Sequence, residues 1–125
     1  MASNYLQPGE TLTLTAPTGG TTKGVGFIDG SIFAIALDSI AQTLPVQGTR
    51  LGVWSHAKAP SQAWTEGQAI YWDDTNKRFS NVATVGFFRV GVAVEAVAGG
   101  AGDTTGKVCL TGEVTFAVSA TYVQR

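Results

Sequence analysis

The strongest constraint on the fold is a two-residue alternation of side-chain character near the C-terminus. Between Val108 and Val118 the even positions are apolar apart from Gly112, whereas polar or small residues such as Lys107 and Glu113 take the odd positions. Successive side chains of a strand point to opposite faces of the sheet. The pattern therefore predicts one long strand with a single buried face.

A second segment alternates in the same way just before it. Its apolar positions, expected to be buried, are Phe88, Val90, Val92, Val94 and Ala96. The glycine-rich stretch 98–106 separates the two segments and is typical of a flexible hairpin connection. The C-terminal part of the chain is therefore predicted to be an antiparallel pair of strands.

Shorter strands are predicted throughout the rest of the chain, at residues 11–15, 25–28, 31–37, 49–55, 68–72 and 78–80. Asp29-Gly30 predicts a tight hairpin, and residues 31–37 are apolar on both faces, which indicates a central strand. Leu51 and Val53 are expected on one side of the strand 49–55. Residues 39–42 and 60–64 suffice for one helical turn each, too short for a stable helix.

These patterns predict an all-β fold, a small antiparallel β-barrel or sandwich with little helix. The length of 125 residues indicates a single domain, 1–125. Residues 1–9 are expected to form an extended N-terminal arm, and residues 119–125 a C-terminal tail.

Composition excludes several functional classes. Charged residues make up 14% of the chain, against about 25% in a typical domain, so either partners or a threonine-rich sandwich surface account for the low charge. A net charge of −1 argues against nucleic-acid binding. No apolar run approaches the roughly 20 residues of a membrane-spanning helix. The single cysteine excludes an internal disulfide.

Residues able to perform catalysis are scarce. The only histidine, His56, follows Ser55 in a strand, so the two side chains point to opposite faces and do not form a nucleophile and base pair. We expect His56 on the surface or rim, and Cys109 as a small, half-buried apolar residue. The sequence thus predicts no catalytic residue.

Cofactor and metal motifs are also missing. Asp73-Asp74 is better explained by a turn than by a calcium loop, because the sixth position of such a loop is Arg78 rather than glycine. Gly102 to Val108 has the wrong spacing for a phosphate-binding loop. We therefore expect no cofactor and no metal.

The aromatic residues leave an alternative open. Trp54, Trp64, Tyr71 and Trp72 would each fit a core, whereas an exposed tryptophan would stack on a sugar or a base. Tyr71 and Trp72 point to opposite faces of their strand, so at most one of them belongs to the same core.

Several segments, in this order and spacing, carry a resemblance to a known family: Tyr5 to Pro17, the Gly30 hairpin, Gly52-Val53-Trp54, the block from Trp64 to Asp73, and Gly91-Val92-Ala93. From about Asn4 to Gly112 the chain resembles the small capsid decoration or cement proteins of tailed phages. The segment 113–125 extends beyond this resemblance.

The resemblance implies a non-enzymatic virion protein that binds the outer surface of the phage head and stabilises the expanded capsid. Its partners would be the major capsid protein and further copies of itself, with a homotrimer favoured, a dimer second and a monomer left open. It would assemble in the host cytoplasm, without nucleic acid or membrane. The alternative is another phage structural module, or one that contacts the host or a glycan through exposed aromatic residues.

We expect the N-terminal arm, extended as far as Thr15, to reach neighbouring subunits by adding a strand to an open sheet edge. The predicted capsid or subunit contacts are Tyr5, Leu6, Pro8, Leu12, Trp54 and Trp72.

Overall fold

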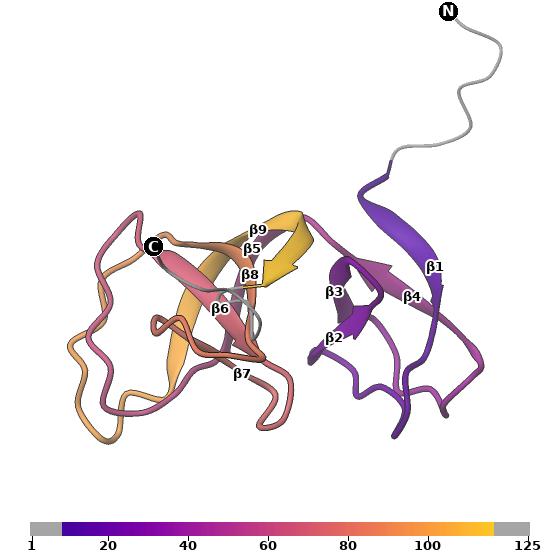
Figure 1. Ribbon diagram of the computed structural model, residues 1–125, viewed down its shortest axis with the longest axis horizontal. Helices are drawn as coiled ribbons and strands as arrows, with labels where there is room; N and C mark the ends of the chain where they lie inside the picture. Colours follow the sequence, from indigo (N-terminus) through magenta and orange to yellow (C-terminus); the bar gives the residue numbers. More distant parts are fainter. Residues whose placement is uncertain (1–8, 117–125) are drawn as a thin grey trace, which may run out of the picture.

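Strands are the only regular secondary structure in the part of the protein that the structure describes. The computed structural model describes the backbone of residues 9–116 and the side chains of residues 9–111. This region contains nine strands and no helix, hence no helix long and apolar enough to span a membrane (Figure 1). The strands are β1 (Thr11–Thr15), β2 (Gly26–Asp29), β3 (Ile32–Ala36), β4 (Pro45–Thr49), β5 (Gly52–Ala57), β6 (Ala69–Asp73), β7 (Arg78–Ser80), β8 (Phe88–Ala93) and β9 (Thr105–Phe116). The all-β prediction is confirmed.

The strands form two antiparallel sheets. The N-terminal sheet has the order β1-β4-β3-β2, and the C-terminal sheet has the order β5-β9-β8-β6-β7. Figure 1 shows them side by side, with β1 at the end of the molecule remote from the loops of the C-terminal sheet. One pair of residues, Ile32 on β3 and Glu113 on β9, links the two ladders.

The C-terminal sheet curls until its two outer strands almost meet. Lys58, directly after β5, forms a single parallel bridge with Phe79 on β7. The backbone N–H of Ala59 donates to the carbonyl of Phe79 at 2.8 Å. One bridge does not close the ladder. The described strands therefore form a curled sheet and not a closed barrel, which was one of the two architectures predicted from the sequence.

The main core lies inside this curl and includes side chains from both sheets. Its buried members are Phe33, Ile35, Trp64, Ile70, Trp72, Phe79, Val90, Ala93, Val108 and Leu110. Phe33 comes from β3 of the N-terminal sheet, and its ring centroid lies 5.0 Å from that of Trp72 and 5.8 Å from that of Phe79. A smaller core, made of Ala16, Phe27, Ala34, Ala36 and Val46, fills the N-terminal sheet. The shared aromatic contacts hold the two sheets together.

The predicted strand at 49–55 is wrong, because the chain breaks there. Gly52 has a φ of +107°, a backbone conformation that other residues rarely adopt, and it begins β5 after β4 has ended at Thr49. The side of β5 that faces the core is not the one that carries Val53. Val53 is 59% exposed, whereas Trp54 is half-buried and His56 is buried.

The alternation of buried and exposed side chains predicted for residues 88–96 is wrong in the second half of this segment, again because the backbone changes its path. The register of β8 shifts between Arg89 and Gly91 in its pairing with both β9 and β6, and against β6 it inserts Val90 in the manner of a β-bulge. Such a shift exchanges the two faces of the strand beyond it. Ala93 is therefore buried and Val94 exposed, the reverse of the expectation.

Other predictions hold more closely. Val108 and Leu110 are buried on β9 while Lys107 is exposed, as the alternation predicts. β3 is central, with pairing to β2, β4 and β9, although the hairpin turn before it lies at Gly30-Ser31, one residue later than expected. The side chains of residues 112–118 lie outside the described part of the chain.

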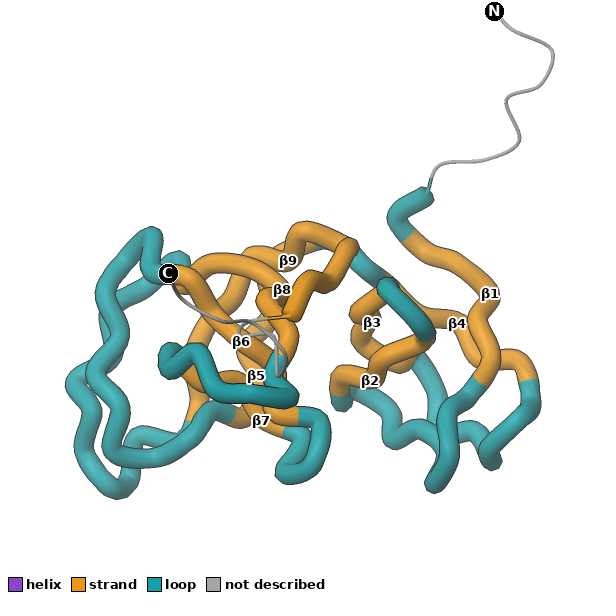
Figure 2. Tube along the Cα trace, viewed as in Figure 1, coloured by secondary structure: helices purple, strands orange, loops and turns teal. Residues whose placement is uncertain are grey.

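Long loops gather at the end of the C-terminal sheet that is remote from β1 (Figure 2). The segments 58–68 and 94–104 run side by side there, because Trp64 pairs with Val97 and the N–H of Ser61 donates to the carbonyl of Gly100. The one-turn helix considered for residues 60–64 is absent, and so is the one for residues 39–42.

Gly26 is a position where the core has no room for a side chain. A Cβ atom added there would lie 2.4 Å from the ring of Phe33 and 3.0 Å from that of Trp72. We expect Gly26→Ala to lower the free energy of unfolding by about 1–3 kcal/mol, the cost of overpacking a dense core. Urea denaturation would measure it.

The matched control is Gly102→Ala, because no atom lies within 4 Å of a Cβ added there. Equal stabilities for the two variants would contradict this account of Gly26.

Candidate functional site

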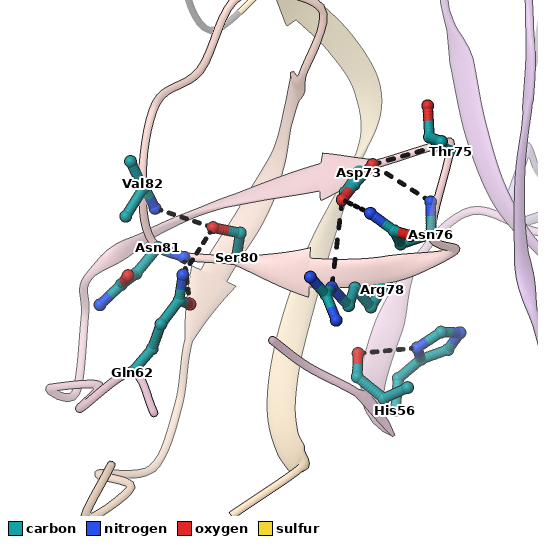
Figure 3. A network of polar contacts seen from close by, with 10 residues as sticks. His56, Gln62, Asp73, Thr75, Asn76, Arg78, Ser80, Asn81 and Val82 are labelled. Carbon is teal, nitrogen blue, oxygen red and sulfur yellow. Dashed lines mark hydrogen bonds and ion pairs between the residues drawn. The ribbon is translucent and has the colours of Figure 1, made fainter. Parts of the chain in front are cut away.

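His56 is buried rather than exposed, which corrects the expectation of a surface histidine. Its imidazole is 7% exposed and packs against the rings of Trp72 and Phe79, at centroid distances of 5.3 and 4.9 Å. Nε2 accepts the backbone N–H of Gly26 at 3.2 Å, so the ring proton sits on Nδ1, which lies 3.2 Å from the carbonyl of Ala57 (Figure 3). Both ring nitrogens therefore serve the fold.

The chemical state of His56 follows from this burial. Loss of solvation lowers the pKa of the imidazole below its ordinary value of about 6.5, and the hydrogen bond to the carbonyl of Ala57 opposes that effect. The neutral ring is thus the form that accepts the Gly26 N–H, because a protonated Nε2 has no lone pair to offer.

A buried lysine is the polar feature that the sequence prediction missed. Lys58 is 2% exposed, and its Nζ donates to the carbonyls of Ala59 at 2.8 Å and Asp103 at 2.9 Å. The ammonium also lies 5.5 Å from the ring centroid of Trp64. Burial lowers the pKa of Lys58, while the charge of Asp103 acts in the opposite direction. Lys58 thus anchors the long connection between β8 and β9.

A signal for Lys58 was present in the sequence. Trp54 and His56 face inward on β5, and Lys58 continues their two-residue spacing. Lys58 lies beyond the end of the strand predicted at 49–55, so the alternation was not extended to it.

The paired aspartates form a turn, as predicted. Asp73 Oδ1 accepts the backbone N–H groups of Thr75 and Asn76 at 3.1 and 3.2 Å, and Oδ2 accepts the side-chain amide of Asn76 at 2.8 Å (Figure 3). Asp74 Oδ1 accepts the indole N–H of Trp72 at 3.0 Å. These carboxylates shape the hairpin between β6 and β7.

A pocket of about 160 Å³ lies where residues 18–27 face Lys77. Three of its backbone N–H groups are already used within the chain: those of Gly19, Gly20 and Thr21 donate to Gln42 Oε1 and to two backbone carbonyls. Lys77 Nζ contacts Asp74 at 2.8 Å. The pocket thus offers a ligand little polar recognition.

The predicted contact residues fall into three groups. Tyr5, Leu6 and Pro8 lie outside the described residues. Leu12 and Trp54 are half-buried on β1 and β5. Trp72 is 0% exposed in the main core, so its assignment to a contact surface is corrected. Its indole fills the space between Phe33 and Phe79, and Tyr71 points to the opposite face of β6.

The other tryptophans also serve the fold. Trp64 is 1% exposed, and Trp54 packs on the rim of the main core with its indole N–H donating to the carbonyl of Leu51 at 3.1 Å. Stacking on a sugar or base needs an open ring face. The burial of Trp64 and Trp72 removes both from consideration as stacking platforms.

The described surface has exposed apolar side chains and an open sheet edge. The connection between β7 and β8 exposes Val82 and Val85, and Leu44 and Val53 are exposed elsewhere; each is more than half accessible. The outer edge of β1 carries three exposed threonines. Contacts with a large partner, rather than chemistry, suit such a surface.

Comparison with known families agrees with this character. Residues 6–110 match the family described as phage cement protein. The chain belongs to this family. The match runs from before β1 to Leu110 of β9, close to the extent of the resemblance read from the sequence. The comparisons with curated proteins and with solved structures found no match.

Membership places this cement protein among capsid-associated structural proteins of phages. A structural family implies a role other than that of an enzyme. The buried positions of His56, Lys58 and Trp72 fit that role, because each is committed to packing or to backbone hydrogen bonds.

The pKa shift of His56 predicts a pH dependence of stability. Below pH 6.5 the unfolded chain binds a proton that the folded chain resists, so the free energy of unfolding should fall as the pH drops from 7 to 5.5. The slope should reach at most about 1.4 kcal/mol per pH unit. Thermal unfolding across this range would measure it.

His56→Gln supplies the control, because glutamine keeps a hydrogen-bond acceptor but does not titrate. Since His56 is the only histidine, the slope should vanish in this variant. An unchanged slope would show that another group is responsible.

Proposed function

We propose that this cement protein binds the outer surface of the phage head and stabilises the expanded capsid, with the major capsid protein as its partner. The family match over residues 6–110 carries the proposal. The protein would act on the exterior of the virion after assembly in the host cytoplasm.

The physical argument is one of linkage. A protein that binds only the expanded lattice stabilises that lattice by mass action, in the same way that a ligand stabilises the state it binds. The binding body must be rigid, so that the energy of contact is not spent on ordering it. A core of interlocked aromatic rings shared by both sheets supports such rigidity.

The chain composition also supports a contact role. Charged residues are 14% of the sequence, and contact cores are depleted in charge. The shared main core supports the chain acting as one domain over residues 1–125. Self-association into a trimer or a dimer would let one protein bridge several capsid subunits.

Co-sedimentation with capsid shells tests the proposal directly. Purified protein should pellet with expanded shells at a saturating ratio near one copy per capsid subunit, and should stay in the supernatant with unexpanded shells. Thermal rupture of the shells should shift upward in the same samples. Failure to bind either shell, or equal binding to both, would overturn the proposal.

The N-terminal arm is proposed to carry part of the contact. Deleting Met1 to Gly9 should abolish binding to expanded shells while leaving the domain folded, because the deleted segment precedes β1. Binding would be measured by co-sedimentation and folding by circular dichroism.

A shorter deletion of Met1 to Asn4 is the matched control, because it retains Tyr5, Leu6 and Pro8. It should bind nearly as well as the full chain. Undiminished binding after the longer deletion would show that the contact lies elsewhere.

A further inference from the structure

The outer edge of β1 is an unprotected strand edge. β1 pairs with β4 along all five of its residues, and among residues 9–116 no strand pairs with its other side. Figure 1 places β1 as the last strand of the N-terminal sheet. An open edge presents a row of backbone donors and acceptors that another strand can use.

The residues that present these groups follow from the ladder. The N–H of Arg50 donates to the carbonyl of Glu10, and the N–H of Ala16 donates to the carbonyl of Leu44, both at 2.9 Å. In an antiparallel strand the backbone groups of successive residues point alternately to one neighbouring strand and to the other. The N–H and C=O groups of the even residues from 10 to 16 therefore point toward β4. The N–H and C=O groups of Thr11, Thr13 and Thr15 therefore point to the open edge.

Three of the usual devices that block an edge are missing from this strand. Residues 11–15 contain no charge and no proline, and their register with β4 is continuous. One side chain partly covers the edge: Asp29 Oδ2 accepts the N–H of Thr15 at 3.4 Å, a long contact.

The sequence of the strand, Thr-Leu-Thr-Leu-Thr, reads the same in both directions. We propose that β1 pairs antiparallel with β1 of a second copy of this chain, around a two-fold axis at Thr13. In this register Thr13 lies opposite Thr13, and Thr11 lies opposite Thr15. In both copies the N–H and C=O groups of Thr11, Thr13 and Thr15 then point toward the other strand. Each N–H donor therefore meets a C=O acceptor.

The side chains match in the same register. Thr11, Thr13 and Thr15 are exposed on one face of β1, and they would meet threonines of the other copy. Leu12 would lie opposite Leu14 on the other face, extending the smaller core across the axis. Glu10 would face Ala16, so no like charges oppose each other. A shift by one residue would place outward groups against inward ones and lose the hydrogen bonds.

A second copy fits this edge because the palindrome places threonine opposite threonine and leucine opposite leucine across a two-fold axis. The pairing is isologous and two-fold, so it selects the dimer, which the resemblance places second, over the trimer that the resemblance favours. Five residues per copy bury far less than the roughly 1,200 Å² of a stable interface, so the free dimer should be weak, with a Kd of roughly 0.1–1 mM. Binding to a common shell would raise the effective concentration and favour it.

Sedimentation equilibrium of the full chain, without capsids and up to about 1 mM protein, tests the pairing. The mass should rise with concentration from 13.0 kDa toward twice that value. Thr13→Pro should weaken association at least about tenfold, because proline lacks the N–H and occurs on edge strands without unfolding them. Thr13→Val, which keeps the backbone donor, is the matched control and should associate like the parent chain.

Two further variants keep the test decisive. Thr13→Lys would place two ammonium groups at the axis, and its weakened association should recover with salt. Asp29→Ala frees the N–H of Thr15 and should strengthen association by about threefold to tenfold. Circular dichroism would show that each variant is folded.

The pairing is overturned by a chain that stays monomeric throughout, by a trimer, or by a dimer that none of Thr13→Pro, Thr13→Lys and Asp29→Ala affects. Because no capsid is present, this result is separate from that of the binding experiment. A dimer that does not bind shells would support the pairing and overturn the proposed function. A monomer that binds expanded shells would overturn the pairing and support the proposed function.

Discussion

The structure depends on the close approach of three rings to one glycine. Gly26 gives its backbone N–H to His56 Nε2, and the absence of a side chain lets the rings of Phe33 and Trp72 lie against its Cα. Because Phe33 belongs to the N-terminal sheet and Trp72 and His56 to the C-terminal sheet, this contact joins the two. A ladder link of one residue pair would hold them far less firmly.

The polar side chains of the core are bonded within the chain, which explains why the protein offers so few groups for catalysis. The neutral imidazole of His56, the ammonium of Lys58 and the carboxylate of Asp73 all bind backbone groups of the chain itself. A buried polar group must be satisfied or it costs stability, and here the satisfaction is internal. Among residues 9–111, the backbone edge of β1 and a few exposed valines remain for partners, which suits a cement protein of a phage capsid.

Much of this fold could be predicted from two-residue periodicity. The alternation that begins at Val108 identified β9, and Asp73-Asp74 identified the hairpin between β6 and β7. The failures share one physical cause, a local change of backbone path. Gly52 interrupts a strand through its positive φ, and the bulge near Arg89 exchanges the faces of β8. Periodicity records which side chains alternate, but it does not record where the backbone inserts a residue.

The contact surface was harder to predict than the fold. Aromatic residues are typical of both cores and interfaces, so Trp72 was assigned to a surface although it fills the core. Lys58 was missed because a charged residue in a predicted loop is ordinarily solvated. The edge of β1 became visible only once strand order was known, since a sequence does not show which strand ends a sheet.

The direction in which β1 runs has a mechanical consequence. The chain enters β1 at Thr11, and the arm that we propose to reach the capsid lies directly before that residue. A pull on the chain before Thr11 that acts in the direction of the strand would load β1 along its own axis. The hydrogen bonds to β4 lie across that axis and would resist sliding together, whereas a pull at right angles would open them one at a time. The strand is thus oriented to bear tension, because the hydrogen bonds of the whole β1–β4 ladder would share the load.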